Sequence, residues 1–292
     1  MKLTIFFFFF FSFTLLGITA GLNAVCYGPQ SRVLLLLTAK LAAREMNDVA
    51  VICESGAESM CRRFMYGPEY EEKGIDEENK AKPTSDPTLM ETALKKANVI
   101  LLTGHDNPIE EKAVNTLLNT AGEGLSKVVL VSQMGGSKAK GGFFGGGNSI
   151  KESEDYIRKV CQSKGLDLSI VRAGMLKGGG CGDVGDDFGL NKVYYNTLVD
   201  VIEASVTMAH DKYSLGADCT LGDTVEMPNM FTQMGSKSSF EPCQYDSNRI
   251  VVAGGAVAAA LKDGEIEFSI GTQSSKTPPS QEDWVKMFDT ME

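Results

Sequence analysis

Short apolar runs alternate with amphipathic stretches along most of this chain. The runs at 49–53, 99–104 and 127–132 are apolar almost throughout, and each is followed by a segment with apolar residues at helical spacing. A strand that is apolar on both sides is typical of a parallel sheet covered on both faces. Alternation of such strands with helices builds βαβ units. The sequence therefore predicts an α/β fold, a Rossmann-like doubly wound parallel sheet with helices on both faces.

The pattern places most of the elements of this fold. The acidic, proline-containing segment 66–87 is predicted to be a surface excursion with at most a poor third strand, and 210–247 has little pattern. No internal repeat is visible. The predicted strands are 22–28, 49–53, 99–104, 127–132, 167–172 and 266–270, and the predicted helices are 31–46, 89–97, 110–121, 149–163, 193–208, 249–261 and 281–289.

Charge and cysteine content exclude several classes of function. The net charge is −10, from 38 acidic and 28 basic residues, so the average surface potential repels phosphate backbones and nucleic acid is not an expected partner. The seven cysteines are odd in number, no pair has Cys-x-x-Cys spacing, and there are two histidines. Neither a disulfide framework nor a metal site is predicted from this pattern.

The N-terminus has the character of a secretory leader. Lys2 precedes an apolar run at 5–16 that contains six consecutive phenylalanines. Its length and polarity are those of a signal-peptide core, so 1–20 is interpreted as a leader and 21–292 as one domain. A membrane anchor is the alternative, because 3–20 approaches the roughly 20 residues that span a bilayer. It is less favoured because the first predicted strand follows Ala20 at once.

The destination after the leader has two interpretations. A protein that enters the secretory pathway is expected to be secreted or to stay in the endoplasmic reticulum, yet its cysteines are sparse and unpatterned for an oxidising compartment. A plastid reached through the endomembrane system is the second interpretation.

Three segments together resemble one known family. They are KVVLVSQMGG at 127–136, KESEDYIRKVCQSKGLDLSIVRAG at 151–174, and RIVVAGGAVAAAL from Arg249, with Val252 where the family usually has Asp. These segments resemble the atypical, NmrA-like branch of the short-chain dehydrogenase/reductases. The resemblance implies an NAD(P)-binding Rossmann-like domain over 21–292, in which 183–247 is a variable, substrate-side insertion.

The first strand–helix turn departs from that family. The family carries Gly-x-x-Gly-x-x-Gly there, and its glycines allow a tight turn, a close pyrophosphate and close helix packing. The matching positions here are Gly28, Ser31 and Leu34. Ser31 is expected to offer its backbone N–H to a phosphate and its hydroxyl as a donor or helix cap, with Arg32 beside it in the cofactor site. Leu34 is expected to push the helix outward and weaken dinucleotide binding.

The family's catalytic pair is also missing. Its hydride-transfer enzymes use Tyr-x-x-x-Lys, in which Tyr is the general acid and Lys binds the nicotinamide ribose. If Lys151 matches that Lys, the Tyr position is Gly147, and none of the eight tyrosines has Lys four residues later. Lys151 is therefore a candidate for ribose binding and catalysis without its partner, and a solvated helix residue is the alternative.

Further candidates lie at the carboxyl ends of strands, where open α/β sheets bind ligands. Ser132 is a catalytic candidate or a turn residue. Gly104 is expected to border the cofactor ribose, and His105 is a candidate proton donor or a solvated loop residue. Glu54, at the end of the second strand, is expected to bind the adenosine ribose hydroxyls. Because a carboxylate repels a 2′-phosphate, NAD is slightly preferred over NADP.

Two remaining features have structural and functional interpretations. Arg172 ends the sixth strand and is expected to pair with an acidic neighbour such as Asp186, with substrate binding as the alternative. The glycine-rich loops at 141–147 and 178–185 are either lids over a substrate or plainly flexible segments.

These observations give two main hypotheses for function. The first is an NAD(P)-dependent oxidoreductase that acts on a small organic substrate without the Tyr–Lys pair. The second is a non-catalytic nucleotide-binding regulatory or assembly factor with a protein partner. A secreted protein with an unrelated ligand is a third interpretation, which depends on the leader alone.

Overall fold

The computed structural model describes residues 21–71, 79–105, 107–138, 146–180, 188–198, 200–224, 235, 239–241, 243 and 245–291. The predicted leader at 1–20, the expected Arg172 partner Asp186 and most of both glycine-rich loops lie outside these residues.

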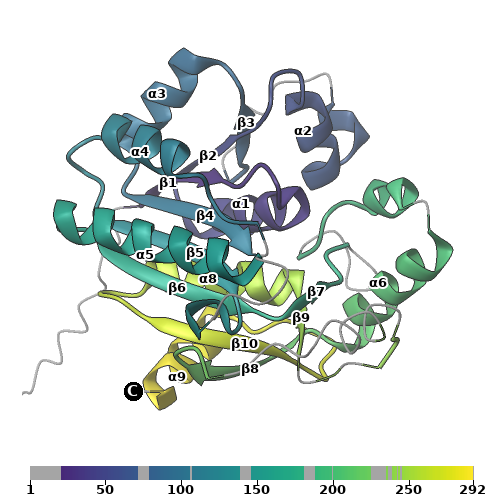
Figure 1. Ribbon diagram of the computed structural model, residues 1–292. Coiled ribbons are helices and arrows are strands. Elements are labelled where there is room, and N and C mark those ends of the chain that lie inside the picture. The colour runs from purple at the N-terminus through teal and green to yellow at the C-terminus, as the bar shows by residue number, and fades with distance from the viewer. Residues whose placement is uncertain are drawn as a thin grey trace, which may run out of the picture.

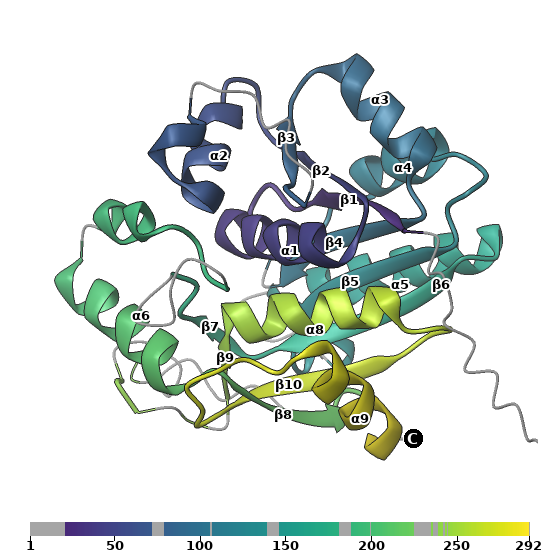
Figure 2. The same ribbon diagram turned by 180° about the vertical axis from the view of Figure 1, so that it is seen from behind.

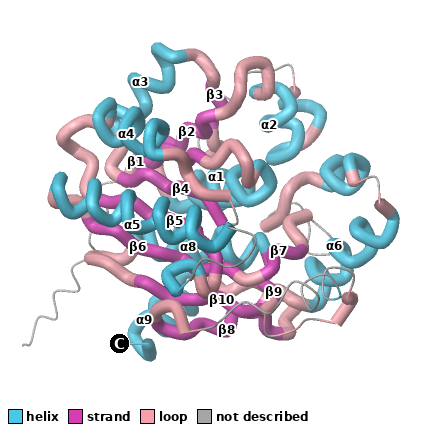
Figure 3. Tube along the Cα trace, viewed as in Figure 1, coloured by secondary structure: helices cyan, strands magenta, loops and turns pink. Residues whose placement is uncertain are grey.

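An eight-stranded sheet forms the centre of the molecule (Figures 1 and 3). Its order is β3-β2-β1-β4-β5-β6-β10-β8, and every neighbouring pair is parallel except β10 and β8. The order runs outward in both directions from β1 and β4, so the predicted doubly wound sheet is confirmed. The strands are β1 Asn23–Tyr27, β2 Asp48–Ile52, β3 Lys82–Thr84, β4 Val99–His105, β5 Lys127–Gln133, β6 Asp167–Ala173, β8 Gly216–Leu221 and β10 Glu267–Gln273.

Helices cover both faces of the sheet (Figures 1 and 2). One face carries α3 Pro87–Lys96, α4 Glu111–Thr120 and α5 Gly146–Lys164, and the other carries α1 Arg32–Glu45 and α8 Arg249–Leu261. Successive side chains of β1 point to opposite faces of the sheet, since Val25 belongs to one buried cluster and Cys26 to the other. The remaining helices are α2 Glu58–Tyr66, α6 Val201–Tyr213 and α9 Gln281–Met291, and short 3-10 helices occupy 68–70, 136–138 and 192–197.

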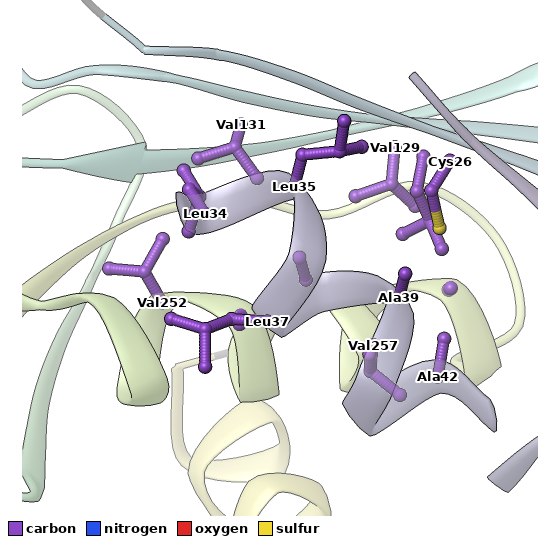
Figure 4. Close-up of a cluster of buried hydrophobic side chains, with 14 of the residues drawn as sticks. Cys26, Leu34, Leu35, Leu37, Ala39, Ala42, Val129, Val131, Val252 and Val257 are labelled. Carbon is purple, nitrogen blue, oxygen red and sulfur yellow. The ribbon is translucent and has the colours of Figure 1, made fainter. Parts of the chain in front are cut away.

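Helix α1 is buried on two sides. Figure 4 shows Leu34 and Leu35 directed toward Val131 and Val129 of β5, and Leu37 directed toward Val252 of α8. Leu34, Leu35, Leu36 and Leu37 are all buried because α8 covers the side of α1 that faces away from the sheet. Each buried leucine contributes about 1.5–3 kcal/mol. The four consecutive leucines therefore fit a helix enclosed between a sheet and a second helix.

The C-terminal half differs from the predicted pattern in three places. The predicted helix at 193–208 is two elements, a 3-10 helix at Lys192–Thr197 and α6. The break occurs because the Asp200 carboxylate accepts the Ile202 N–H at 2.8 Å and starts a new helix. Strands β7 (Met175–Lys177) and β9 (Asp246–Asn248) form a small second sheet, and β8 adds an antiparallel edge to the main sheet. Among the described residues, no helix has the length and apolar character needed to cross a membrane.

Candidate functional site

A cavity of about 820 Å³ opens at the carboxyl ends of the central strands. It lies where the strand order reverses between β1 and β4, the usual ligand position in open α/β sheets. Its walls come from the β1–α1 turn, the ends of β4 and β5, β7, the first half of α6, and Arg249 at the start of α8. The lining residues are Gln30, Ser31, Arg32, Val33, Leu34, His105, Asn107, Gln133, Met175, Leu176, Lys177, Asp200, Ile202, Glu203, Val206, Thr207 and Arg249.

The β1–α1 turn is held against the end of β4. A Cβ at Gly28 would lie 1.9 Å from the Thr103 hydroxyl oxygen and 2.6 Å from the Thr103 carbonyl oxygen, so this close approach requires glycine. The Ser31 N–H donates to the Gly28 carbonyl at 3.2 Å, and the Ser31 hydroxyl donates to the Gly104 carbonyl at 3.2 Å. The Ser31 hydroxyl therefore joins the turn to the end of β4 and makes no capping bond to α1, so the expected side-chain cap is wrong. The expected contact of its N–H with a phosphate stays a prediction.

The N-terminus of α1 forms one wall of the cavity. Its N-cap makes no side-chain capping bond, and the first helical hydrogen bond runs from Leu35 N–H to the Ser31 carbonyl. The preceding N–H groups, those of Arg32, Val33 and Leu34, belong to residues that line the cavity. Such first-turn donors have no partner inside their own helix and favour an anion. The N-terminus of α1 therefore favours an anion at this wall of the cavity, through the N–H groups of Arg32 and the two residues that follow it.

The Leu34 side chain does not obstruct this wall. It is 1% exposed and belongs to the buried cluster that joins α1 to the sheet and α8, as Figure 4 shows. The position that the family fills with a third glycine is therefore filled here by a core leucine.

Two arginines add positive charge at the cavity. Arg32 has its Nη2 3.5 Å from Glu54 Oε2 and its Nη1 3.9 Å from Met60 Sδ. Arg249 donates from Nη1 to the Gly178 carbonyl at 2.8 Å. Glu54 is exposed beside Arg32, so the residue predicted to bind the adenosine ribose lies next to a predicted cofactor-site residue. Opposite charges that are mostly exposed hold each other weakly, so either side chain can turn to a ligand.

Ser132 is drawn into a buried ionic network instead of the cavity. Its hydroxyl donates to Glu154, whose two carboxylate oxygens each accept from Arg172 at 2.8 Å. Arg172 also donates to Glu267 Oε1 at 2.7 and 2.9 Å and lies 3.6 Å from Asp223. Burial would lower the pKa of Arg172, but the hydrogen bonds and charges of Glu154, Glu267 and Asp223 raise it above its ordinary value. The expected pairing of Arg172 with acid is confirmed, with partners other than the named Asp186.

Lys151 meets the edge of the same network. Its Nζ donates to the Ser137 carbonyl at 3.0 Å and lies 3.9 Å from Asp155. The N–H groups of Gly135 and Ser137 donate to Asp223 at 2.6 and 2.9 Å. Lys151 is not among the cavity-lining residues, and Gly147 lies one turn before it on α5. Ser132 therefore connects β5 to α5, and Lys151 connects α5 to the short helix after β5.

His105 lines the cavity, and its side chain is held by a hydrogen bond to a backbone carbonyl. The residue is 6% exposed and has a positive φ of 49° at a register shift between β4 and β5. Its Nε2 lies 2.7 Å from the Gly174 carbonyl, a distance that assigns the Nε2 proton to that bond. Of the three predicted catalytic residues, His105 is the one that lines the cavity. Its hydrogen bond to Gly174 joins β4 to the end of β6.

Helix α6 supplies a wall that sequence reasoning did not assign. Asp200 and Glu203 line the cavity from this helix, opposite in charge to Arg32 and Arg249. Further along α6, Asp211 accepts from the N–H groups of Gly179 and Gly180 at 2.8 Å each.

The Asp211 carboxylate also accepts from the Tyr195 hydroxyl at 2.8 Å. Burial raises the pKa of Asp211 to about 6, although these hydrogen bonds lower it. The described start of the second glycine-rich loop is therefore anchored to α6.

Other lining residues were also missed, with weak signals at best. Gln133 is the last residue of β5, one position after the predicted Ser132. Lys177 forms a buried ion pair with Asp246 at 2.9 Å, which links β7 to β9. Arg249 was visible only as the first residue of a predicted helix and of the third segment that resembles the family. Within the described residues, no group of three or more His, Cys, Asp or Glu side chains is arranged to hold a metal ion.

The fold is similar to that of solved reductases. Yeast methylglyoxal/isovaleraldehyde reductase complexed with NADPH matches 84% of this chain and 77% of its own, with 11% identity and a TM-score of 0.50. A wide-type short-chain dehydrogenase/reductase from Veillonella parvula, in complex with NADP, matches 89% and 99% with 12% identity and a TM-score of 0.47. Vestitone reductase from alfalfa (Medicago sativa) matches 85% and 78% with 12% identity and a TM-score of 0.47.

The likeness at this identity concerns the fold alone. No family model matches the sequence, and no curated protein matches it either.

Proposed function

We propose that the cavity binds a nicotinamide dinucleotide and that the protein is an NAD(P)-binding oxidoreductase of the atypical, NmrA-like short-chain type. The observation that carries this proposal is the N-terminus of α1 at the strand-order reversal, with Arg32 and Arg249 on the same cavity. The pyrophosphate would meet the first-turn N–H groups of α1 and the two guanidinium groups. The volume of about 820 Å³ lies within the usual range of ligand sites.

The nicotinamide would supply the chemistry, as a hydride donor or acceptor. The chain's own residues would position the nucleotide and exclude water. Because Gly147 stands at the position of the family's Tyr, we expect little alcohol dehydrogenase activity of the Tyr-dependent kind. Gly147→Tyr beside the wild type tests this. Robust wild-type turnover that is abolished by changing another tyrosine would show that the match of Lys151 is wrong.

The second candidate is a non-catalytic nucleotide-binding regulatory or assembly factor. The hydrogen bonds of two predicted catalytic residues favour it, since the hydroxyl of Ser132 and the ammonium of Lys151 both have structural partners. The two candidates share nucleotide binding and differ in turnover. Hydride transfer separates them, and it is measured as the loss of NAD(P)H absorbance over a panel of carbonyl substrates. Binding without turnover supports the second.

Thermal-shift titration with NADH, NADPH and their oxidised forms tests the shared step. A ligand at 100 times its Kd stabilises the native state by about 2.7 kcal/mol. Arg32→Ala and Arg249→Ala are each expected to weaken binding roughly tenfold or more, because a charged hydrogen bond is lost. Arg158→Ala is the control, since that arginine contacts Glu267 and is not a cavity residue. The absence of any nucleotide-dependent shift would contradict both candidates.

Within this proposal, Glu54 favours NAD(H). Its carboxylate is exposed 3.5 Å from Arg32 and would accept from the adenosine ribose hydroxyls. Arg62 donates to the Tyr70 and Glu71 carbonyls and Arg63 to the Glu71 carboxylate, so both are engaged away from Glu54. Isothermal titration is expected to give a lower Kd for NADH than for NADPH. Tighter NADPH binding that is unchanged in Glu54→Ala would remove this residue from the site.

The N-terminal segment 1–20 is proposed to be a cleaved leader for the secretory pathway, with secretion, the endoplasmic reticulum or a plastid as destination. Strand β1 begins at Asn23, whose N–H donates to Asn98 Oδ1 at 2.9 Å. Cleavage after Ala20 would therefore leave the strand whole. N-terminal sequencing of the native protein is expected to find a start between Gly21 and Val25. An intact Met1 in a membrane fraction would support the anchor instead.

A further inference from the structure

Gln133 is the polar residue at the end of β5 that faces the cavity. Val129 and Val131 of the same strand belong to the buried cluster on the α1 and α8 face, and side chains alternate along a strand, so Gln133 lies on that face too. Ser132 lies on the opposite face, where its hydroxyl donates to Glu154 of α5. The polar group that β5 offers to the cavity is therefore the Gln133 carboxamide.

This carboxamide is available for a ligand. The backbone carbonyl of Gln133 accepts from Arg172 at 3.3 Å, but no described residue forms a hydrogen bond with its side chain. The residue is half-buried. A carboxamide donates from its nitrogen, accepts at its oxygen and carries no charge. It can therefore bind an uncharged carbonyl or hydroxyl group.

Within the proposed function, on which this inference rests, Gln133 lies away from the adenosine end of the cavity. Glu54 follows β2 and α1 follows β1, and the sheet continues in the order β2-β1-β4-β5-β6. A dinucleotide with its adenosine at Glu54 and its pyrophosphate at α1 would extend toward the ends of β4 and β5, where His105 and Gln133 line the cavity. A substrate beside its other end would meet Gln133 and the wall that follows.

The wall that follows Gln133 is apolar. Gln133 pairs with Ala173 of β6, and β7 begins two residues later. Met175 and Leu176 of β7 and Val206 of α6 all line the cavity. Met175 and Val206 are buried and Leu176 is half-buried. Apolar side chains of this kind favour a ligand with a hydrocarbon body, because contact removes apolar surface from water.

The charged groups on the β7 and α6 walls do not favour a charged substrate. Lys177 forms a buried ion pair with Asp246 at 2.9 Å, and the Asp200 carboxylate caps α6. Glu203 is exposed and would repel an anion. A substrate ammonium or carboxylate would also lose water against the apolar wall, at a cost that only a paired charge recovers.

We propose that this part of the cavity binds an uncharged, apolar compound with one carbonyl or hydroxyl group, and that the Gln133 carboxamide forms a hydrogen bond with that oxygen. A carbonyl oxygen accepts from the Gln133 nitrogen, and a hydroxyl donates to the Gln133 oxygen. One side chain thus recognises both the oxidised and the reduced form of such a compound. The hydrocarbon body packs on Met175, Leu176 and Val206, and compounds with a carboxylate, phosphate or ammonium group are excluded.

Three small probes test this ligand class by ligand-observed NMR. Acetophenone has a carbonyl on an apolar body, ethylbenzene has the same carbon skeleton without the oxygen, and benzoate has a similar size and a negative charge. Their dissociation constants are measured by saturation-transfer titration of the full-length protein, without nucleotide and with saturating NADH. We expect acetophenone to bind about tenfold more tightly than benzoate, because the benzoate charge would be desolvated without a partner.

Variants separate the hydrogen bond from the apolar contact. Gln133→Leu keeps the size of the side chain and should raise the Kd of acetophenone about fivefold, the value of one neutral hydrogen bond, without weakening ethylbenzene. Gln162→Leu, at an exposed glutamine of α5, is its matched control. Ile202→Ser removes an apolar residue that lines the cavity and is 56% exposed, and it should weaken both probes about threefold. Val285→Ser, at 57% exposure on α9, should weaken neither.

The outcomes distinguish this inference from the proposed function. Benzoate that binds as tightly as acetophenone, an acetophenone Kd that Gln133→Leu leaves unchanged, or no binding of acetophenone at its solubility limit would each overturn the inference. The absence of a nucleotide-dependent thermal shift would instead contradict the proposed function. In that event, the titrations without nucleotide would still show whether the cavity binds an uncharged carbonyl compound through Gln133.

Discussion

Replacement of Arg172 by Met should cost more stability than any replacement of a surface ion pair in this protein. Arg172 has no exposed surface, and the side chains of two of its partners, Glu154 and Asp223, are each only 4% exposed. Methionine has a similar length and no charge, so the variant leaves two buried carboxylates without their counter-ion. Removal of one partner of a buried ion pair costs about 3–5 kcal/mol.

The remaining hydrogen bonds limit that cost. Asp223 keeps its hydrogen bonds from the N–H groups of Gly135 and Ser137, and Glu154 keeps its hydrogen bond from the Ser132 hydroxyl. The loss in the free energy of unfolding should therefore stay near that of a single broken ion pair, at about 3–5 kcal/mol. This is a large share of the roughly 5–15 kcal/mol typical of a folded domain. The free energy of unfolding, from urea titration followed by circular dichroism, measures it.

Two further variants test the reasoning. Arg158→Met removes an exposed arginine 3.0 Å from Glu267 and should cost about 0–1 kcal/mol. Adding Glu154→Gln to Arg172→Met removes one of the stranded charges and should recover part of the loss. If Arg172→Met costs no more than Arg158→Met, or if the added Glu154→Gln only deepens the loss, the ionic network does not hold this region together.

Three smaller predictions concern backbone contact and titration. Gly28→Ala should destabilise the fold by about 1–3 kcal/mol because its Cβ would meet Thr103, whereas Gly124→Ala, with its nearest contact at 3.5 Å, should be close to neutral in the same urea assay. Burial raises the pKa of Asp211 to about 6, so the native state binds more protons between its ordinary pKa and about 6. Stability should therefore fall by about 3 kcal/mol as pH rises through this window, and Asp211→Asn should flatten the profile. Burial lowers the pKa of Lys127 to about 8, so wild-type stability should rise between about pH 8 and 10 while Lys127→Met shows no such rise.

The sheet could be predicted from sequence wherever its strands are apolar on both faces. The central strands β4 and β5 are buried along nearly their whole length, so their residues form continuous apolar runs. Strand β3 is short and contains Pro83, and β8 alternates between half-buried and exposed residues at an edge. Neither strand has a pattern that separates it from a loop, because edge strands are covered less than central ones.

The candidate site could be predicted where it follows from fold geometry. Ser31, Arg32 and His105 line the cavity because they follow strands at the strand-order reversal. Ser132 was placed by the same argument, and it is engaged elsewhere because Glu154, the partner of Arg172, accepts its hydroxyl. Lys151 was placed by the family pattern alone, and it contacts Ser137 and Asp155 outside the cavity. The partners that surround Arg172 come from positions 18 to 95 residues away in the chain. No local pattern reveals that so many distant carboxylates meet one buried guanidinium.

The charges around the cavity restrict what can fill it. Arg32, Arg249 and the N-terminus of α1 favour an anionic group at one side, while Asp200 and Glu203 line it from α6. Asp200 already accepts the Ile202 N–H at 2.8 Å, so its charge is partly satisfied by the helix that it caps. Glu203 is exposed, and its charge would oppose a second anionic group near α6. A ligand that spans both walls must therefore be anionic toward α1 and neutral or cationic toward α6. A dinucleotide with its pyrophosphate at α1 and an uncharged substrate toward α6 meets this requirement, whereas a substrate with its own carboxylate or phosphate does not.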